Sequence, residues 1–304
     1  MKDVHFTQLN ADTKKERNTM RKTYRYLLAA FMFVAVIATQ AQVGKIRNRQ
    51  KDESVEQANL NAKQQFVAAS PDATTICTYT FSAGTGNNNF IKYCVTANGN
   101  IVTFQSPSGH EYLATSKGEG YSICDYDSGK QYYDYGAYGD SGNWDAATKV
   151  SSSATSVKIA RTTADGLYTL TQTITLEAGN AVAQVSMALK NNDTVAHDVG
   201  LIRYADVDAD GFTSNSFDST FRTAFGYSAT DGYGLQLIWV SNSANAFSNG
   251  GVAQDIPGGP SCQIFAGSPG AAFQNTDGSI FIDVDIPTLA KKASATFVAE
   301  YKSF

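Results

Sequence analysis

From residue 74 to the C-terminus, apolar and polar residues alternate in short runs that are separated by turn-forming residues. The last run shows the pattern plainly, with Ala295, Phe297, Ala299 and Tyr301 at every second position. A period of two places one face of a β-strand toward a core and the other toward solvent. The pattern therefore predicts an all-β chain, and it argues against coiled coils and helical bundles.

Turn signals mark the joints between these runs. Asn98-Gly99 is a strong hairpin signal, and Asp165-Gly166 separates two later runs. About a dozen strands fit one large sandwich of two antiparallel sheets. Two smaller sandwiches would need a linker, and no Pro- or Ser-rich joint is present. The irregular stretch at 128–155 is expected to be a long surface loop. The strands are expected at residues 74–82, 90–96, 101–105, 156–162, 167–176, 181–190, 196–204, 222–228, 234–240, 263–266, 280–286 and 294–301.

The beginning of the chain has the layout of a secretory signal peptide. Arg21, Lys22 and Arg25 form a positive segment, residues 27–38 are apolar, and small residues within 39–41 suit cleavage. We therefore expect a signal segment at 1–41, of which 1–19 is either a long leader or a mis-assigned start. A polar linker at 42–70 would precede a β-sandwich domain at 71–304.

An uncleaved membrane anchor is the alternative interpretation of the same segment. Its strongly apolar part is shorter than the roughly 20 residues that a bilayer requires. Basic residues on its far side also oppose the positive-inside bias. We expect no membrane span in the mature chain, which would be secreted or held at the cell surface.

Charge is distributed unevenly along the chain. Residues 1–41 carry seven Lys or Arg against three Asp or Glu, which leaves 17 against 25 for the rest. A net-acidic body is poorly suited to phosphate backbones, so we expect no nucleic-acid partner.

The four cysteines all lie in the predicted mature chain and agree with export. Cys77 and Cys94 lie at equal distances from the turn around Thr85-Gly86, so a simple hairpin would place them opposite one another. Cys124 and Cys262 would then form the second disulfide. Three pairings are possible for four cysteines, and four buried thiols are the remaining alternative. The wide spacing argues against a zinc site made of cysteines.

Two short stretches resemble a known type of domain. Residues 191–194, Asn-Asn-Asp-Thr, precede an alternating run, and residues 286–289 precede the closing strand. Both resemble secreted bacterial sandwiches of the super-sandwich, galactose-mutarotase-like type. The resemblance covers about 40 residues. It implies a fold and no catalytic residue.

The sharpest local motif is Asp206-Val207-Asp208-Ala209-Asp210-Gly211. Carboxylates at alternate positions before a glycine match the opening of a calcium loop, to which Ser214 and Asp218 could add oxygen ligands. The Glu expected at the twelfth position is missing, so the motif is not an EF-hand. A solvated strand face is the alternative, because a strand places all three aspartates on one side. Asp283 and Asp285 also share one face, which we expect to be exposed to solvent.

Aromatic residues gather between positions 121 and 144 and are interleaved with aspartates. Rings beside carboxylates suit a sugar-binding surface, while the same composition suits a loop that closes over the core. The candidate ligand-binding residues are Tyr132, Tyr133, Tyr135, Tyr138 and Trp144.

Catalytic combinations are scarce. His110 and His197 are the two histidines after the signal segment, and no nucleophile-elbow motif is present. His197 follows a turn, and we expect it to be exposed. A sugar-active enzyme could still assemble His110 with a carboxylate across strands.

These features predict an exported binding or structural module without catalytic activity, with Ca²⁺ as a possible stabilising ion. Its partner would be an extracellular glycan or a surface protein. The alternative is a carbohydrate-binding or carbohydrate-active protein of the mutarotase-like type. In an enzyme, His110 and a carboxylate should converge on a concave sheet face beside exposed aromatic rings.

Overall fold

The computed structural model describes residues 75–85, 89–212, 214–220, 222–243, 246–253, 262 and 277–304. The signal segment expected at 1–41, the linker at 42–70 and the strand at 263–266 lie outside these residues. Within them, no helix is long and apolar enough to cross a membrane.

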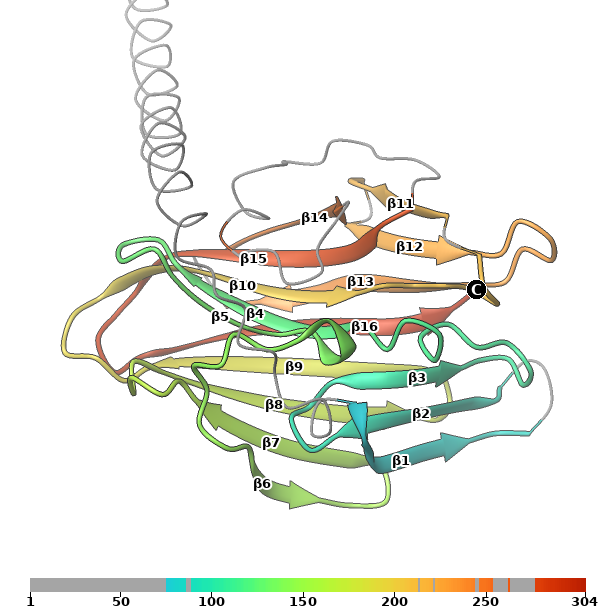
Figure 1. Ribbon diagram of the computed structural model, residues 1–304, viewed down its shortest axis with the longest axis horizontal. Helices are drawn as coiled ribbons and strands as arrows, with labels where there is room; N and C mark the ends of the chain where they lie inside the picture. Colours follow the sequence, from blue (N-terminus) through green and yellow to red (C-terminus); the bar gives the residue numbers. More distant parts are fainter. Residues whose placement is uncertain are drawn as a thin grey trace, which may run out of the picture. The chain divides into compact units, whose positions relative to one another are not determined.

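Three antiparallel sheets make up the described part of the chain (Figure 1). The smallest contains β1 (Cys77–Ala83), β2 (Ile91–Thr96) and β3 (Ile101–Gln105). The second has the order β14 (Phe247–Ala253), β15 (Ser279–Leu289), β10 (His197–Ala205), β4 (Glu119–Asp125) and β5 (Lys130–Asp134). The largest has the order β11 (Asn215–Asp218), β12 (Thr223–Tyr227), β13 (Gly234–Asn242), β16 (Ser294–Ser303), β9 (Val182–Asn191), β8 (Tyr168–Glu177), β7 (Ser156–Thr162) and β6 (Thr148–Ser152).

The three sheets share one hydrophobic core. Tyr93 and Phe104 enter it from the three-stranded sheet, Leu201 from the five-stranded sheet, and Leu170 and Phe297 from the eight-stranded sheet. Strand β1 contacts β8, and β15 contacts both β13 and β16, so both smaller sheets pack on the largest one. The prediction of a large antiparallel sandwich is confirmed.

Burial differs between the strands of this sandwich. In β8 buried residues alternate with half-buried ones, as expected for a strand with one face on the core. Every residue of β4 is buried, and so are the last seven residues of β10. The centre of the five-stranded sheet is therefore covered on both faces, which a period of two does not reveal.

The prediction of a long surface loop at 128–155 is wrong in part. This stretch contains β5, a single 3-10 turn at η1 (Gly136–Tyr138), and β6. All five residues of β6 are exposed, so this strand has no apolar face from which it could be predicted.

The hairpin predicted at Asn98-Gly99 joins β2 to β3. Gly99 adopts φ +94°, a conformation that L side chains rarely adopt. A Cβ atom at this position would also lie 2.5 Å from the Gln172 side chain of β8. The glycine thus allows the turn to approach the largest sheet closely.

Both predicted disulfides are present, Cys77–Cys94 and Cys124–Cys262. The first does not join directly opposite residues. An irregularity in β1 pairs Cys77 with Thr96 and Thr80 with Cys94, while the cysteine Cα atoms remain 5.5 Å apart. The second encloses a sequence separation of 138 residues and begins in β4.

A buried ion pair connects the three sheets. Arg203 of β10 and Glu119 of β4 are both fully buried, with Nη2 2.5 Å from Oε1. Arg203 also donates to Oε1 of Gln172 in β8 at 2.6 Å and to the Gly99 carbonyl at 3.2 Å. Glu119 accepts the amide of Ile101 in β3 at 2.5 Å and the hydroxyl of Tyr301 in β16 at 2.7 Å.

Arg203→Met should lower the free energy of unfolding by about 3–5 kcal/mol, because it leaves the Glu119 charge buried and unpaired. Adding Glu119→Gln should recover part of this loss. Guanidinium unfolding measures both effects, and the exposed Lys158→Met serves as the control, with a change within about 0.5 kcal/mol. If the double variant lost as much as the sum of the two single variants, the two side chains would not be energetically coupled.

Candidate functional site

A second, smaller hydrophobic cluster lies apart from the main core. It consists of Tyr135, Ile202, Tyr204 and Phe281, with Tyr138 packed against it. Within β10 the side chains of Ile202 and Tyr204 alternate with those of Leu201 and Arg203, so this cluster lies on the opposite face of the five-stranded sheet. We call this face the outer face.

Aromatic rings dominate the cluster. The rings of Tyr135 and Tyr204 have centroids 4.5 Å apart, and Tyr133 stacks on Tyr135 at 5.2 Å. Tyr204 and Tyr135 are buried, whereas Tyr133 and Tyr138 retain partial exposure. The outer face therefore presents ring surface near solvent through Tyr133 and Tyr138.

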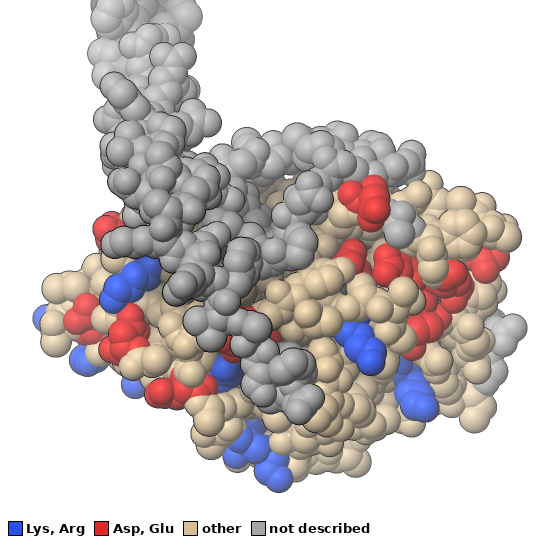
Figure 2. Space-filling model, in the orientation of Figure 1, with Lys and Arg blue, Asp and Glu red and all other residues tan. Residues whose placement is uncertain are grey.

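Carboxylates adjoin these rings where β10 ends. Asp206 and Asp208 follow β10 directly, and Asp277 precedes the paired strand β15. We call these three residues the acidic end. Asp206 and Asp208 are half-buried and Asp277 is exposed. Figure 2 shows Asp and Glu side chains gathered toward the end of the sandwich where β12 and the C-terminus lie.

The acidic end is electrostatically unfavourable without a partner. Burial raises the pKa of Asp206, and the negative charge of Asp277 adds to this rise. Burial, together with the charges of Asp206 and Asp277, raises the pKa of Asp208 to about 6. A hydrogen-bond donor or a cation at this position would therefore relieve repulsion.

A hydrogen bond joins the acidic end to the aromatic segment. The Tyr138 hydroxyl donates to Oδ2 of Asp206. Tyr138 belongs to the segment predicted to contact glycan, and Asp206 belongs to the motif predicted to bind calcium. The structure thus brings together at one site two features that lie 68 residues apart in the sequence.

The other residues of the predicted calcium loop lie elsewhere. Asp210 adopts a left-handed φ of 52°, and its carboxylate accepts Nδ1 of His110 at 2.6 Å and the Glu111 amide at 3.0 Å. The Ser214 carbonyl accepts the amide of Tyr227, and Asp218 accepts the amide of Thr220. Of the five predicted ligands, the structure therefore places Asp206 and Asp208 at the acidic end.

The predicted aromatic residues divide into buried and half-buried rings. Tyr132 is buried in the main core and donates to Asp165 at 2.6 Å, and Tyr135 is fully buried in the outer cluster. Trp144 packs edge-on against Tyr132 and donates to the Tyr133 carbonyl at 3.2 Å. Since a sugar needs an accessible ring face, only the half-buried Tyr133, Tyr138 and Trp144 can offer one in this arrangement.

Asp283 and Asp285 lie on the outer face of β15, and the expectation of an exposed face is wrong. Asp283 is only 7% exposed, and its Oδ1 is buried without a hydrogen-bond partner. Burial, and then the charge of Asp285, raises the pKa of Asp283 from 3.8 to about 7. Alternation correctly placed both carboxylates on one face but could not show that this face is covered.

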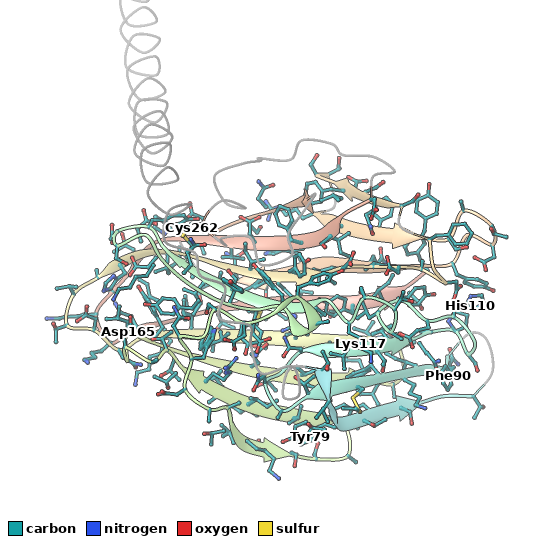
Figure 3. All side chains as sticks on the ribbon, viewed as in Figure 1. Tyr79, Phe90, His110, Lys117, Asp165 and Cys262 are labelled. Carbon is teal, nitrogen blue, oxygen red and sulfur yellow. A yellow bond between two sulfur atoms is a disulfide. The ribbon has the colours of Figure 1, made fainter. Side chains whose placement is uncertain are left out.

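Neither histidine belongs to the acidic end. Besides Asp210, the His110 ring lies 3.7 Å from Oδ2 of Asp231 and 4.0 Å from the Tyr233 ring centroid. These residues come from connecting segments, not from a sheet face. The His197 side chain is only 10% exposed, so the expectation of an exposed residue is wrong. Figure 3 places His110 at the opposite end of the sandwich from Cys262 and Asp165.

Sequence reasoning missed Asp277 and Asp231. Each is the aspartate of an Asp-Gly turn pair in a connecting segment, and neither belongs to an alternating run. Only strand pairing and loop packing place them beside the predicted residues.

No protein-family model matches this chain, and no curated protein matches it either. Similar solved structures include a putative aldose 1-epimerase from Escherichia coli K12, with 11% identity and a TM-score of 0.44, covering 74% of this chain and 99% of that one. A galactose mutarotase-like protein from Lactobacillus casei has 12% identity and a TM-score of 0.41, covering 74% of this chain and 100% of that one. A bacterial glucoamylase in complex with acarbose has 14% identity and a TM-score of 0.47, covering 75% of this chain and 32% of that one.

The matched structures include the galactose mutarotase-like type that residues 191–194 and 286–289 resemble. At TM-scores below 0.5, this likeness supports no conclusion about family, ligand or reaction.

Asp283→Asn should stabilise the protein at pH 8 by about 4 kcal/mol, since the parent must keep a buried carboxylate charged there. Because folding raises the pKa of Asp283 from 3.8 to about 7, this carboxyl group adds to the stability of the parent protein below pH 4. That contribution is lost as the pH rises through 7. The advantage of the variant should therefore grow between pH 4 and pH 7.

Denaturant unfolding at a series of pH values measures this difference. The exposed Asp145→Asn is the matched control and should follow the parent at every pH. A constant difference between Asp283→Asn and the parent from pH 4 to pH 8 would contradict the raised pKa.

Proposed function

We propose that this chain is an exported β-sandwich that binds a ligand without converting it, and that the ligand is an extracellular glycan. The binding site would be the patch formed by Tyr133, Tyr138, Asp206 and Asp208. The observation that carries the proposal is the hydrogen bond from Tyr138 to Asp206, because it joins half-buried aromatic rings to half-buried carboxylates.

The chemistry of the patch fits a polyhydroxylated ligand. The apolar C–H faces of a sugar stack on aromatic rings, while carboxylate oxygens accept its hydroxyl protons. Asp208 has a pKa raised by burial and by neighbouring charges, so hydroxyl donors from a ligand would lower its cost of ionisation. A surface protein is the alternative partner for the same patch.

Export is supported by the cysteine chemistry. All four cysteines of the chain are paired in disulfides, which form and persist in oxidising compartments. The signal segment predicted at 1–41 agrees with this location.

Glycan binding can be tested by probing an oligosaccharide array with the purified protein. Tyr138→Ala and Asp208→Asn should each weaken binding by about tenfold or more, because one removes a ring face and the other an acceptor charge. Tyr138→Phe keeps the ring and should have a smaller effect. The partly exposed ring of β1, changed in Tyr79→Ala, is the control. Failure of the folded protein to bind any glycan, or equal binding by all variants, would reject the proposal.

Calcium is a second candidate ligand of the acidic end. Asp206, Asp208 and Asp277 repel one another, and hard carboxylate oxygens are the ligands that Ca²⁺ prefers. In this proposal the ion would stabilise the fold and order the same patch.

The melting temperature in millimolar Ca²⁺ should exceed that in EDTA, and Asp208→Asn should abolish the difference. A ligand present at 100 times its Kd adds about 2.7 kcal/mol to the native state, which differential scanning calorimetry resolves readily. Asp210→Asn is the informative comparison, since its carboxylate lies against His110 and its loss should leave the shift intact. Coincident melting curves for the parent protein would exclude calcium.

A further inference from the structure

Two turns meet at the end of the sandwich opposite His110. Asp125 is the last residue of β4, and His197 is the first residue of the neighbouring strand β10. The amide of Tyr126 donates to the Asp198 carbonyl at 2.9 Å, and the amide of Asp198 donates to Oδ2 of Asp127 at 2.8 Å. These bonds fix the turn after β4 against the beginning of β10.

The His197 ring is held from one side. Its Nε2 lies 3.0 Å from Oδ2 of Asp193. Edge-on packing against the Tyr168 ring, at 5.6 Å between centroids, fixes the plane of the imidazole. Asp193 is placed to accept the N–H of Nε2, and in a ring that carries only this proton Nδ1 keeps its lone pair.

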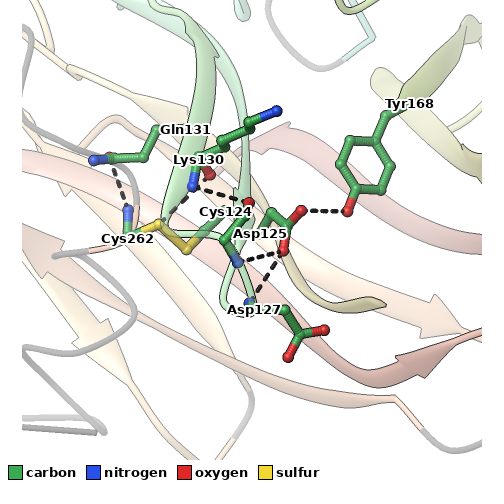
Figure 4. Close-up of a disulfide and its surroundings, with 8 residues drawn as sticks. Cys124, Asp125, Asp127, Lys130, Gln131, Tyr168 and Cys262 are labelled. Atoms are coloured by element: carbon green, nitrogen blue, oxygen red, sulfur yellow. Dashed lines mark hydrogen bonds between the residues drawn. A yellow bond between two sulfur atoms is a disulfide. The ribbon is translucent and has the colours of Figure 1, made fainter. Parts of the chain in front are cut away.

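Nδ1 of His197 is buried and makes no hydrogen bond, although it lies 3.2 Å from Oδ2 of Asp125. Asp125 is itself fully buried. Its Oδ1 accepts the amides of Asp127 and Ser128, at 3.1 and 3.2 Å, and its Oδ2 accepts the Tyr168 hydroxyl at 2.9 Å (Figure 4). Asp125 thus accepts hydrogen bonds on both of its carboxyl oxygens.

With a single proton on the ring, at Nε2, the lone pair of Nδ1 faces a carboxylate oxygen in a buried place, whereas a second proton would make this contact an ion pair. Two such atoms repel one another unless a cation or a proton lies between them. Two ligands of a tetrahedral metal with bonds of about 2.0 Å lie about 3.3 Å apart, close to the separation observed here. The pair formed by His110 and Asp210 is closer, at 2.6 Å, and is hydrogen-bonded.

A third ligand is at hand. Asp127 offers a carboxylate oxygen, and ligand atoms of Asp125, Asp127 and His197 all lie within 4.8 Å of one another. Asp193 occupies the position of the carboxylate that orients a metal-binding histidine through its other ring nitrogen. Asp127 is exposed, so an ion has access from solvent.

We propose that Asp125, Asp127 and Nδ1 of His197 bind a divalent transition metal of the zinc class. One nitrogen and two carboxylate oxygens suit Zn²⁺ better than Ca²⁺, which prefers oxygen ligands alone. The ion would join the turn after β4 to the beginning of β10. This site is separate from the acidic end and does not depend on glycan or calcium binding there.

Isothermal titration of the full protein with Zn²⁺, in a buffer containing millimolar Ca²⁺, tests the site. One Zn²⁺ per chain should bind, and His197→Gln should weaken its affinity by at least about a hundredfold. His110→Gln is the matched control and should bind Zn²⁺ like the parent. Asp193→Asn, which keeps all three ligands, should weaken binding by about 10–100-fold.

Asp127→Asn separates a loss of Zn²⁺ binding from a loss of folding, since Asp127 is exposed whereas Asp125 is buried. It should weaken Zn²⁺ binding while the melting temperature in EDTA stays that of the parent. Substituting Co²⁺ should give visible absorption bands that His197→Gln removes. The proposal is overturned if the parent does not bind Zn²⁺, or if His197→Gln binds it as tightly as the parent.

If the parent does not bind Zn²⁺, the alternative to a metal is a second proton on the His197 ring, between two carboxylates. Nitrogen NMR at pH 7.5 would then show both ring nitrogens carrying protons, and the ring would form an ion pair with Asp125 and Asp193. Binding lost in His110→Gln alone would place the metal at the other end of the sandwich, and that result also overturns the proposal.

Discussion

The ion pair between Glu119 and Arg203 holds the three sheets in register. Both charges lie in the five-stranded sheet, yet their remaining hydrogen bonds reach the β2–β3 turn, β3, β8 and β16. Because each of these bonds ends in the interior, a shift of one sheet against another would leave a buried charge without its partner. Hydrophobic contact alone tolerates sliding, whereas a buried pair of this kind permits one arrangement. The outer face is the other side of the same five-stranded sheet, so its position also depends on this ion pair.

The period of two and the Asn98-Gly99 turn were enough to predict the fold class and most strands, and the equal spacing of Cys77 and Cys94 about an earlier turn predicted the first disulfide. These are local signals, because the alternation of apolar and polar residues within a strand indicates which of its faces is buried. The prediction failed where burial does not alternate. Strand β6 is exposed throughout, and Asp283 lies on a face that its own sequence cannot show to be covered.

The candidate site was predictable as two halves but not as a whole. The tyrosine-rich segment and the aspartates after β10 are visible as local composition, and only the folded chain brings Tyr138 to Asp206. Asp210 does not lie with the other predicted aspartates, because its backbone adopts a left-handed φ and its carboxylate is hydrogen-bonded to His110. No local signal placed Asp277 beside Asp206 and Asp208, since that contact depends on which strands become neighbours.

Strand β10 links the two ends of the molecule. Its nine residues span about 30 Å, from His197 beside Asp125, the neighbour of the disulfide-bonded Cys124, to the residue before Asp206. At the first end, turn-to-turn hydrogen bonds and a covalent cross-link restrain the backbone. At the other end, the strand leaves the sheet into half-buried carboxylates. Just beyond the strand, the amides of Asp206 and Asp208 donate to the carbonyls of Gly118 and Tyr112, so hydrogen bonds hold the chain at this end as well. Both ends of β10 are therefore fixed to neighbouring segments, and the strand keeps the two ends at a constant separation.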